Sequence, residues 1–87
     1  MTDSRRKPAD WMQLPIDERI LEVLHSSDLI LSPTIIAENI DKSRGEVSRR
    51  LSELTDRSLV ERLERGRYQI TEDGRAYLYG ELDAGKL

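Results

Sequence analysis

The side chains of this sequence that could bind a charged ligand are chiefly arginines, and they are concentrated in one stretch. Eleven of the fourteen basic residues are arginine, and seven of these lie in residues 43–67. That stretch carries five acidic side chains and a net charge of +2, whereas residues 8–42 carry two basic and seven acidic side chains. A guanidinium group can donate paired hydrogen bonds to a phosphate or to a guanine edge. The stretch therefore has the chemistry to bind a polyanion, provided that its elements present the arginines together.

The first half of this stretch has the pattern of a helix over residues 43–57. Ser43-Arg44-Gly45-Glu46 fits a capping box, in which Ser43 accepts a hydrogen bond from the backbone N–H of Glu46. Val47, Leu51 and Leu54 follow at the spacing of one apolar helix face. With that stripe facing inward, a helical wheel places Gly45, Arg49, Ser52 and Asp56 on the outer side, with Arg44 and Ser48 flanking its leading end.

This outer face has the donors that reading DNA would need. Arg44 and Arg49 could contact guanine or phosphate, and Ser48 and Ser52 could hydrogen-bond to either, while Gly45 permits close approach to a groove wall. Arg50 points sideways, so it either reaches DNA or pairs with Glu46 or Glu53. The residues that we expect at a DNA surface are Ser43, Arg44, Gly45, Ser48, Arg49, Arg50 and Ser52, joined by Arg65, Gly66 and Arg67 of the next element.

Beyond residue 58 the apolar period changes from 3.6 to 2. Residues 59–64 and 67–71 flank Arg65-Gly66, which predicts a two-stranded hairpin. Its tip, residues 64–68, sets Arg65 and Arg67 on either side of a turn glycine, where both could reach phosphates or a narrow minor groove. The alternative is a tip whose charges only keep it soluble. Arg57 and Arg62 are weaker candidates, because acidic neighbours could neutralise them.

The remaining elements form a scaffold for the helix and the hairpin. Helical spacing begins at Ile16 and ends near Ser26-Ser27-Asp28, and residues 29–31 fit a brief strand. Ser32 and Pro33 open a second helix of about two turns, and Thr71 caps a final helix that includes Leu82. We expect a mobile tail over residues 1–10, a domain over 11–83 and a frayed end over 84–87. The order of elements predicts an α+β fold, the winged helix-turn-helix.

Composition excludes most other classes of function. The chain has no cysteine, so it has neither a disulfide framework nor a cysteine-built metal site, and its lone histidine, His25, is better explained as structural. No catalytic constellation is present, so we expect no enzyme activity, no cofactor and no small-molecule substrate. No apolar run approaches the roughly 20 residues of a membrane span, so we expect no membrane association and a cytoplasmic location.

Trp11, Tyr77 and Tyr79 are placed to pack together, within one subunit or across a dimer.

Size and charge suggest how such a domain would work. A chain of 87 residues forms one domain with a modest core, which dimerisation would supplement. The net charge of −3 and the preference for arginine over lysine suggest adaptation to high salt, although so short a chain can reach that balance by chance. The tail residues Arg5, Arg6 and Lys7 could add phosphate contacts.

Several runs of the sequence resemble a known family. Residues 43–54 contain the pattern V-S-R-R-L-x-x-L, which is followed by L-V-x-R at 59–62 and by Y-x-I-T-x-x-G at 68–74. Over residues 10–83 the chain is similar to archaeal winged-helix regulators, in particular to small haloarchaeal proteins that resemble phage repressors, and more loosely to the MarR-like group. The resemblance implies dimeric DNA binding and repression. The long flanking helices that build the dimer and the ligand pocket of larger MarR-type proteins are missing, which puts an effector-binding role in doubt.

The sequence thus predicts a regulator of transcription that binds double-stranded DNA, most simply as a homodimer. Phosphate contacts from the hairpin and tail would supply affinity, and the outer face of the helix would supply sequence preference. A winged helix that binds another protein, with no DNA contact, is the alternative. The overall acidity and the acidic residues Glu46, Glu53 and Asp56 on the third helix favour that reading.

Overall fold

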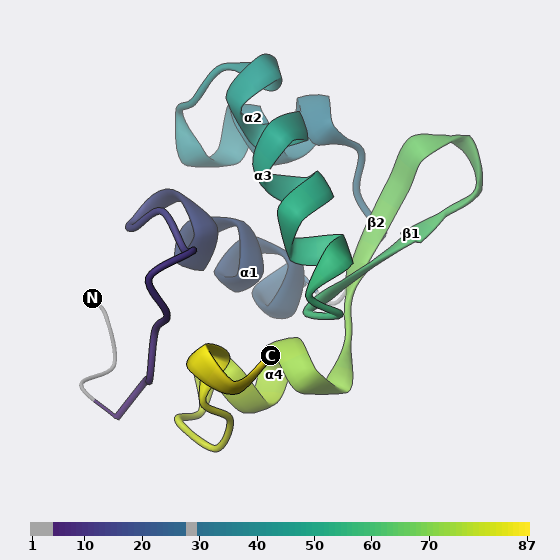
Figure 1. Ribbon diagram of the computed structural model, residues 1–87. Helices are drawn as coiled ribbons and strands as arrows, with labels where there is room; N and C mark the ends of the chain where they lie inside the picture. The colour runs from purple at the N-terminus through teal and green to yellow at the C-terminus, as the bar shows by residue number, and fades with distance from the viewer. Residues whose placement is uncertain (1–4, 28–29) are drawn as a thin grey trace.

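The computed structural model describes residues 5–27 and 30–87. Its four α-helices pack around one hydrophobic core. The helices are α1 (Ile16–Ser27), α2 (Pro33–Ile40), α3 (Arg44–Asp56) and α4 (Glu72–Leu78). α1 lies at the centre and contacts the other three, with α2 and α3 on one side and α4 on the other (Figure 1). The predicted α+β winged helix-turn-helix is confirmed. No helix in the described ranges is long and apolar enough to span a membrane.

The helices begin where the sequence supplies capping side chains. Ser32 accepts a hydrogen bond from the N–H of Ile35 and is followed by Pro33 in the first turn of α2. Thr71 accepts one from the N–H of Gly74 at the start of α4. An N-cap side chain satisfies a backbone donor that the helix itself leaves without a partner, which is why these polar residues fix the starts.

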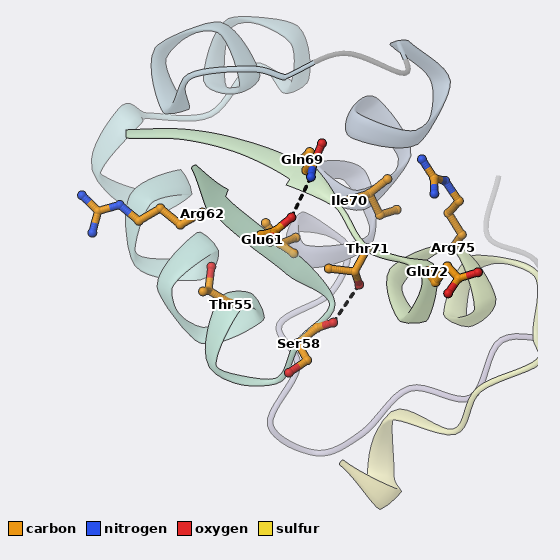
Figure 2. A pocket seen from close by; sticks show the side chains of 10 residues that line it. Thr55, Ser58, Glu61, Arg62, Gln69, Ile70, Thr71, Glu72 and Arg75 are labelled. Atoms are coloured by element: carbon orange, nitrogen blue, oxygen red, sulfur yellow. Dashed lines mark hydrogen bonds between the residues drawn. The ribbon is translucent and has the colours of Figure 1, made fainter. Parts of the chain in front are cut away.

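The hairpin pairs β1 (Val60–Leu63) with β2 (Arg67–Ile70) in an antiparallel register that sets Val60 opposite Ile70. Its base is closed by a hydrogen bond from the Thr71 hydroxyl to the carbonyl of Ser58 (2.7 Å), as Figure 2 shows. On the other edge of β2, Leu31 forms a two-hydrogen-bond bridge to Tyr68. The strand expected at 29–31 is reduced to this bridge at Leu31, and Leu29, like Asp28, lies outside the described residues.

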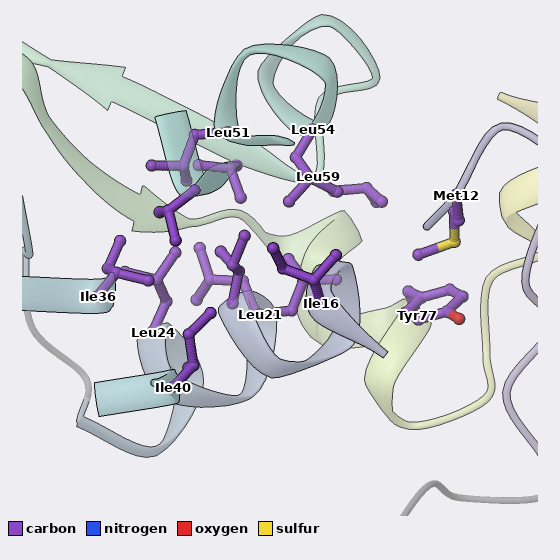
Figure 3. Packing of buried hydrophobic residues seen from close by; sticks show 14 of the residues in the cluster. Met12, Ile16, Leu21, Leu24, Ile36, Ile40, Leu51, Leu54, Leu59 and Tyr77 are labelled. Carbon is purple, nitrogen blue, oxygen red and sulfur yellow. The ribbon is translucent and has the colours of Figure 1, made fainter. Parts of the chain in front are cut away.

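The core is a single cluster of aliphatic side chains gathered between the helices and the inner face of the hairpin (Figure 3). α1 supplies Leu21 and Leu24, and α3 supplies Leu51 and Leu54, all of which are essentially unexposed. Leu59, between α3 and β1, is also fully buried. Because α3 contributes only one stripe to this core, its opposite side is left facing solvent.

Both ends of the described chain are more ordered than the sequence suggested. Residues 5–10 pack against the domain where a mobile tail was expected, and residues 1–4 of that tail lie outside the described residues. Ala84–Lys86 form a 3₁₀ turn where fraying was expected, and Ala84 is fully buried. The N–H of Ala84 donates to the carbonyl of Lys7 (3.0 Å), so the two ends hold one another.

The final helix is shorter than predicted. α4 ends at Leu78, before Leu82, because Gly80 adopts the left-handed conformation (φ 78°). The N–H groups of Gly80 and Glu81 donate back to the carbonyls of Tyr77 and Ala76, the arrangement with which a glycine commonly ends a helix.

Candidate nucleic-acid interface

Ser43 caps the N-terminus of α3 as predicted, but the Glu46 carboxylate meets the Ser43 hydroxyl and not the backbone N–H that a complete capping box would use. The Ser43 hydroxyl oxygen accepts a hydrogen bond from the N–H of Glu46 (3.1 Å) and donates one to the Glu46 carboxylate (3.1 Å). Both side chains are exposed, so this cap is formed at the surface. It fixes the residue at which α3 begins, and thereby the position of every later side chain along the helix axis.

The orientation of α3 agrees with the helical-wheel prediction. Its three apolar residues, Val47, Leu51 and Leu54, are completely buried. The residues expected on the opposite side are all exposed: Gly45, Arg49, Ser52 and Asp56. Arg44 is exposed as well, and Ser48 is half-buried at the flank. α3 therefore presents an exposed polar strip that is small and cationic over its first turns and ends at the acidic Asp56.

Gly45 and Arg49 lie against each other within this strip. A Cβ built on Gly45 would come 3.7 Å from a terminal nitrogen of Arg49, so the guanidinium folds back over the first turn of the helix. That turn is the part of a recognition helix that enters deepest into a groove. The glycine leaves the guanidinium close to the helix backbone and keeps the turn narrow.

The hairpin tip supplies the second pair of cations. The three-residue turn Glu64–Gly66 holds Arg65 and Gly66 at positive φ (62° and 66°), a conformation that glycine adopts freely and arginine adopts at a cost. Arg65 and Arg67 are both exposed. The tip is the part of the hairpin farthest from the helices (Figure 1).

Arg50, which we included among the residues expected at a DNA surface, is engaged inside the fold. Its guanidinium donates to both carboxylate oxygens of Asp17 (2.8 and 2.9 Å) and to the carbonyl of Trp11 (3.2 Å). These hydrogen bonds raise the pKa of Arg50 above its ordinary value, against the opposing effect of burial. The expected pairing with Glu46 or Glu53 is wrong, because the partner is on α1, 33 residues earlier in the chain.

Arg57, at the end of α3, is also occupied. It pairs with Glu53 (3.1 Å), and its guanidinium carbon lies 4.7 Å from the centre of the Trp11 ring. Trp11 donates its indole N–H to the carbonyl of Ala84 (3.2 Å), so it packs against arginines and the C-terminal turn. Within the subunit the described residues show no ring contact of Trp11 with Tyr77 or Tyr79, and the expected alternative, a contact across a dimer, stays a prediction.

The two tyrosines of the last helical region have separate contacts. Tyr77 is buried and donates its hydroxyl proton to the Glu18 carboxylate (2.6 Å). Burial, reinforced by this hydrogen bond, raises the pKa of Tyr77 well above its ordinary value. Tyr79 is half exposed and hydrogen-bonds to His25 (3.0 Å).

The N-terminal basic segment is partly neutralised by its own domain. Arg6 pairs with Glu22 (2.8 Å) and lies 3.5 Å from the buried Glu18 carboxylate, and it donates to the carbonyl of Leu78 (3.0 Å). The phosphate contact expected of Arg6 is therefore not supported, because its guanidinium is tied to α1 and α4. Lys7 remains exposed.

The sequence made Arg62 a weaker candidate because acidic neighbours could neutralise it, but within the described ranges it has no ion-pair partner. It lies on β1 opposite Tyr68, on the same face as Val60, and it is exposed. At the base of the hairpin an open groove is lined by charged and hydroxyl side chains, and Figure 2 shows Arg62 extending away from Glu72 and Arg75 at its other end. The acidic neighbour Glu61 is held by Gln69 (2.6 Å) and does not pair with Arg62. Strand alternation was the available signal, since adjacent residues point to opposite faces.

The exposed arginines that have no ion-pair partner in the described ranges are concentrated on α3 and the hairpin. Six arginines are exposed and have no ion-pair partner within the described ranges, and only Arg19 of these lies outside α3 and the hairpin. The other five are Arg44, Arg49, Arg62, Arg65 and Arg67. Among the described residues no group of three or more histidine or acidic side chains is arranged to hold a metal ion.

Comparisons with known proteins identify the family and the fold. Residues 5–87 match the model of the winged helix-turn-helix phage repressor family. The crystal structure of the PhiH1 repressor-like protein from Haloarcula marismortui is 43% identical with a TM-score of 0.86, and the match covers 97% of this chain and 96% of that one. A Pseudomonas aeruginosa PA01 protein assigned as a transcriptional regulator shares the fold (TM-score 0.70) at 22% identity, over 79% of this chain and 52% of its own. Curated proteins gave no match.

Proposed function

This chain belongs to the winged helix-turn-helix phage repressor family, and on that premise we propose that it represses transcription by binding duplex DNA as a homodimer. The outer face of α3 enters the major groove, and the hairpin tip contacts the adjacent backbone or minor groove. One observation supports this most directly. Of the six exposed arginines without an ion-pair partner in the described ranges, all but Arg19 lie on α3 and the hairpin, whereas Arg6, Arg50 and Arg57 are paired with acids of the same chain.

The division of roles follows from position along α3. Arg49 lies over the first turn and contacts a base edge. Two parallel N–H donors of its guanidinium match the N7 and O6 acceptors of guanine. Arg44 and Ser48 lie beside it, and Ser52 one turn further along. The cations of the hairpin, Arg62, Arg65 and Arg67, contact phosphates and so supply affinity with little sequence information.

The test uses duplexes selected by the protein itself from a random-sequence pool, with binding followed by fluorescence anisotropy. Arg49→Ala is expected to cost about 1–3 kcal/mol and to relax the preference at one position. Arg65→Ala and Arg67→Ala are expected to weaken binding to all sequences and to reduce the slope of log K against log salt by about 1 each. Arg19→Ala is the matched control, because Arg19 is an exposed, unpaired arginine on α1.

Two outcomes would overturn the proposal. If the protein selects no duplex at any salt concentration, the alternative of a protein-binding winged helix, with Glu46 and Asp56 in its contact surface, becomes the better account. If Arg19→Ala weakens binding as much as Arg49→Ala does, the contact surface is not the one described. Dimeric binding is checked by the selected sites, which should contain two half-sites about 10 base pairs apart or a multiple of that spacing.

A further inference from the structure

Asp17 is a charged residue with no exposed surface, and its carboxylate is directed at α3. It lies in the first turn of α1 and is 0% exposed. It accepts three hydrogen bonds: two from the guanidinium of Arg50 and one from the backbone N–H of Gln13 (3.0 Å). The two bonds from Arg50 use separate nitrogens and separate oxygens, so the planes of the two groups are fixed relative to each other.

Trp11 extends this contact along the same side of α3. Its carbonyl accepts from Arg50, and its ring packs against Arg57. Positions 50 and 57 are seven residues apart, or about two helical turns, so both arginines project from one side of the helix. We call the four residues Trp11, Asp17, Arg50 and Arg57 the α3 clamp.

The α3 clamp restricts the rotation of α3 about its own axis, which the apolar contacts of the helix restrict less. Val47, Leu51 and Leu54 hold α3 by apolar contact, which is non-directional and tolerates small rotations of the helix. A rotation of about 15° moves a side chain about 6 Å from the helix axis by roughly 1.5 Å, more than the range over which a hydrogen bond remains good. Arg49 directly precedes Arg50, so fixing Arg50 against α1 also fixes the direction of Arg49.

We propose that Asp17, through the α3 clamp, positions α3 for sequence-specific DNA recognition without touching DNA, and that Arg50 is a positioning residue with no contact to DNA. The inference rests on the proposed function. Stability alone does not account for such a pair, because replacing a buried ion pair with apolar residues of similar size is often neutral or stabilising. The value of the pair lies in the geometry that it imposes on the outer face of α3.

The experiment separates geometry from stability by replacing both charges together. The variant Asp17→Leu with Arg50→Met keeps the net charge and fills the site with apolar side chains. It is compared with its two single variants, Asp17→Leu and Arg50→Met, and with Asp17→Asn, Arg49→Ala and the exposed control Arg19→Met. Each variant is measured for thermal unfolding, for its affinity for the duplexes selected by the wild-type protein and for a scrambled duplex, and for the salt dependence of both affinities.

The inference predicts that the double variant folds with a melting temperature close to that of the wild type and loses about tenfold in affinity for the selected duplexes, the equivalent of one good base contact. Its affinity for the scrambled duplex and its salt slope stay unchanged. Asp17→Asn loses specific affinity in the same way. Because the α3 clamp acts as a unit, the double variant loses less than the sum of its two single variants.

Three results would overturn the inference. Wild-type affinity in the double variant would show that the apolar core alone orients α3. Unchanged or tighter binding by Asp17→Asn, with weaker binding and a lower salt slope in Arg50→Met, would show that Arg50 contacts DNA directly. A double variant that does not fold would show that the α3 clamp is needed for the stability of the fold and not specifically for the orientation of α3. If Arg49→Ala weakens binding while the variants at Asp17 do not, the inference fails and the proposed function stands, whereas a wild-type protein that binds no duplex removes both.

Discussion

Replacing Gly45 with alanine is expected to stabilise the protein and to weaken its binding to DNA. Gly45 lies in the first turn of α3 with an ordinary helical backbone, and a Cβ there would meet nothing nearer than Arg49, at 3.7 Å. The added methyl group therefore fits without strain and lowers the entropy of the unfolded chain, a gain of about 0.5–1 kcal/mol. For a domain of this size that gain raises the melting temperature by about 2–8 °C.

The same methyl group lies on the side of α3 that must approach the groove wall. Its bulk keeps the first turn, and with it Arg49, slightly farther from the groove. We expect a loss of about 1 kcal/mol of binding free energy, or roughly fivefold in affinity, since one imperfect base contact costs at least this much. Circular dichroism melts and fluorescence anisotropy on one protein preparation would measure both effects.

A matched control is Ser26→Ala, in the exposed last turn of α1, which adds helix propensity without altering α3. It should raise stability slightly and leave DNA affinity unchanged. Two results would refute the reasoning. A lower melting temperature for Gly45→Ala would mean that the first turn of α3 is not regular helix, and unchanged DNA affinity would mean that this turn does not enter the groove.

Three further substitutions test the packing that supports α3 and the hairpin. Gly74→Ala should cost about 1–3 kcal/mol in urea unfolding, because its Cβ would lie 2.6 Å from a side-chain carbon of the buried Ile70; a neutral result would show that the site can open. Tyr77→Phe should cost about 1.5–3 kcal/mol by removing the hydroxyl that donates to buried Glu18. Because the folded-state pKa of Tyr77 is raised, the wild-type free energy of unfolding should fall as pH rises above about 10, and Tyr77→Phe should lose that part of the slope; an identical slope would contradict the assignment. Ser43→Ala should cost about 1 kcal/mol by removing the N-cap of α3, with wild-type stability as the contrary result in the same denaturation experiment.

Local signals explain why the helix starts and the hairpin could be predicted. Ser32, Ser43 and Thr71 each act on a backbone N–H three residues later, so their effect is visible within a few letters of sequence. The buried stripe of α3 has the helical period and the hairpin has a period of 2, and both patterns need only neighbouring positions. The outward direction of Arg49 follows from the same arithmetic.

Contacts between distant parts of the chain were not predictable in this way. The bond between Arg50 and Asp17 joins residues 33 apart, and nothing in the neighbourhood of either residue selects that partner over a nearby acid such as Glu53. The packing of residues 5–10 depended similarly on Arg6 reaching carboxylates on α1. A charged side chain has many possible partners in sequence, and only the assembled fold brings one of them within reach.

The consecutive carboxylates of Asp17 and Glu18 give α1 a unique register among its neighbours. Successive residues of a helix project about 100° apart, so one carboxylate meets Arg50 on α3 while the next meets Tyr77 on α4. A helix displaced by one position would turn the apolar residues of α1 out of the core and would also take each acid away from its partner, so the apolar stripe and the two charges select the same register. Inserting a single residue between Glu18 and Arg19 would leave both acids with their partners but would turn Ile20, Leu21 and Leu24 about 100° out of the core. The same insertion between Pro15 and Ile16 falls at the boundary of the helix, where the preceding segment can absorb it, so the interior of α1 is less tolerant of a change in length than its start.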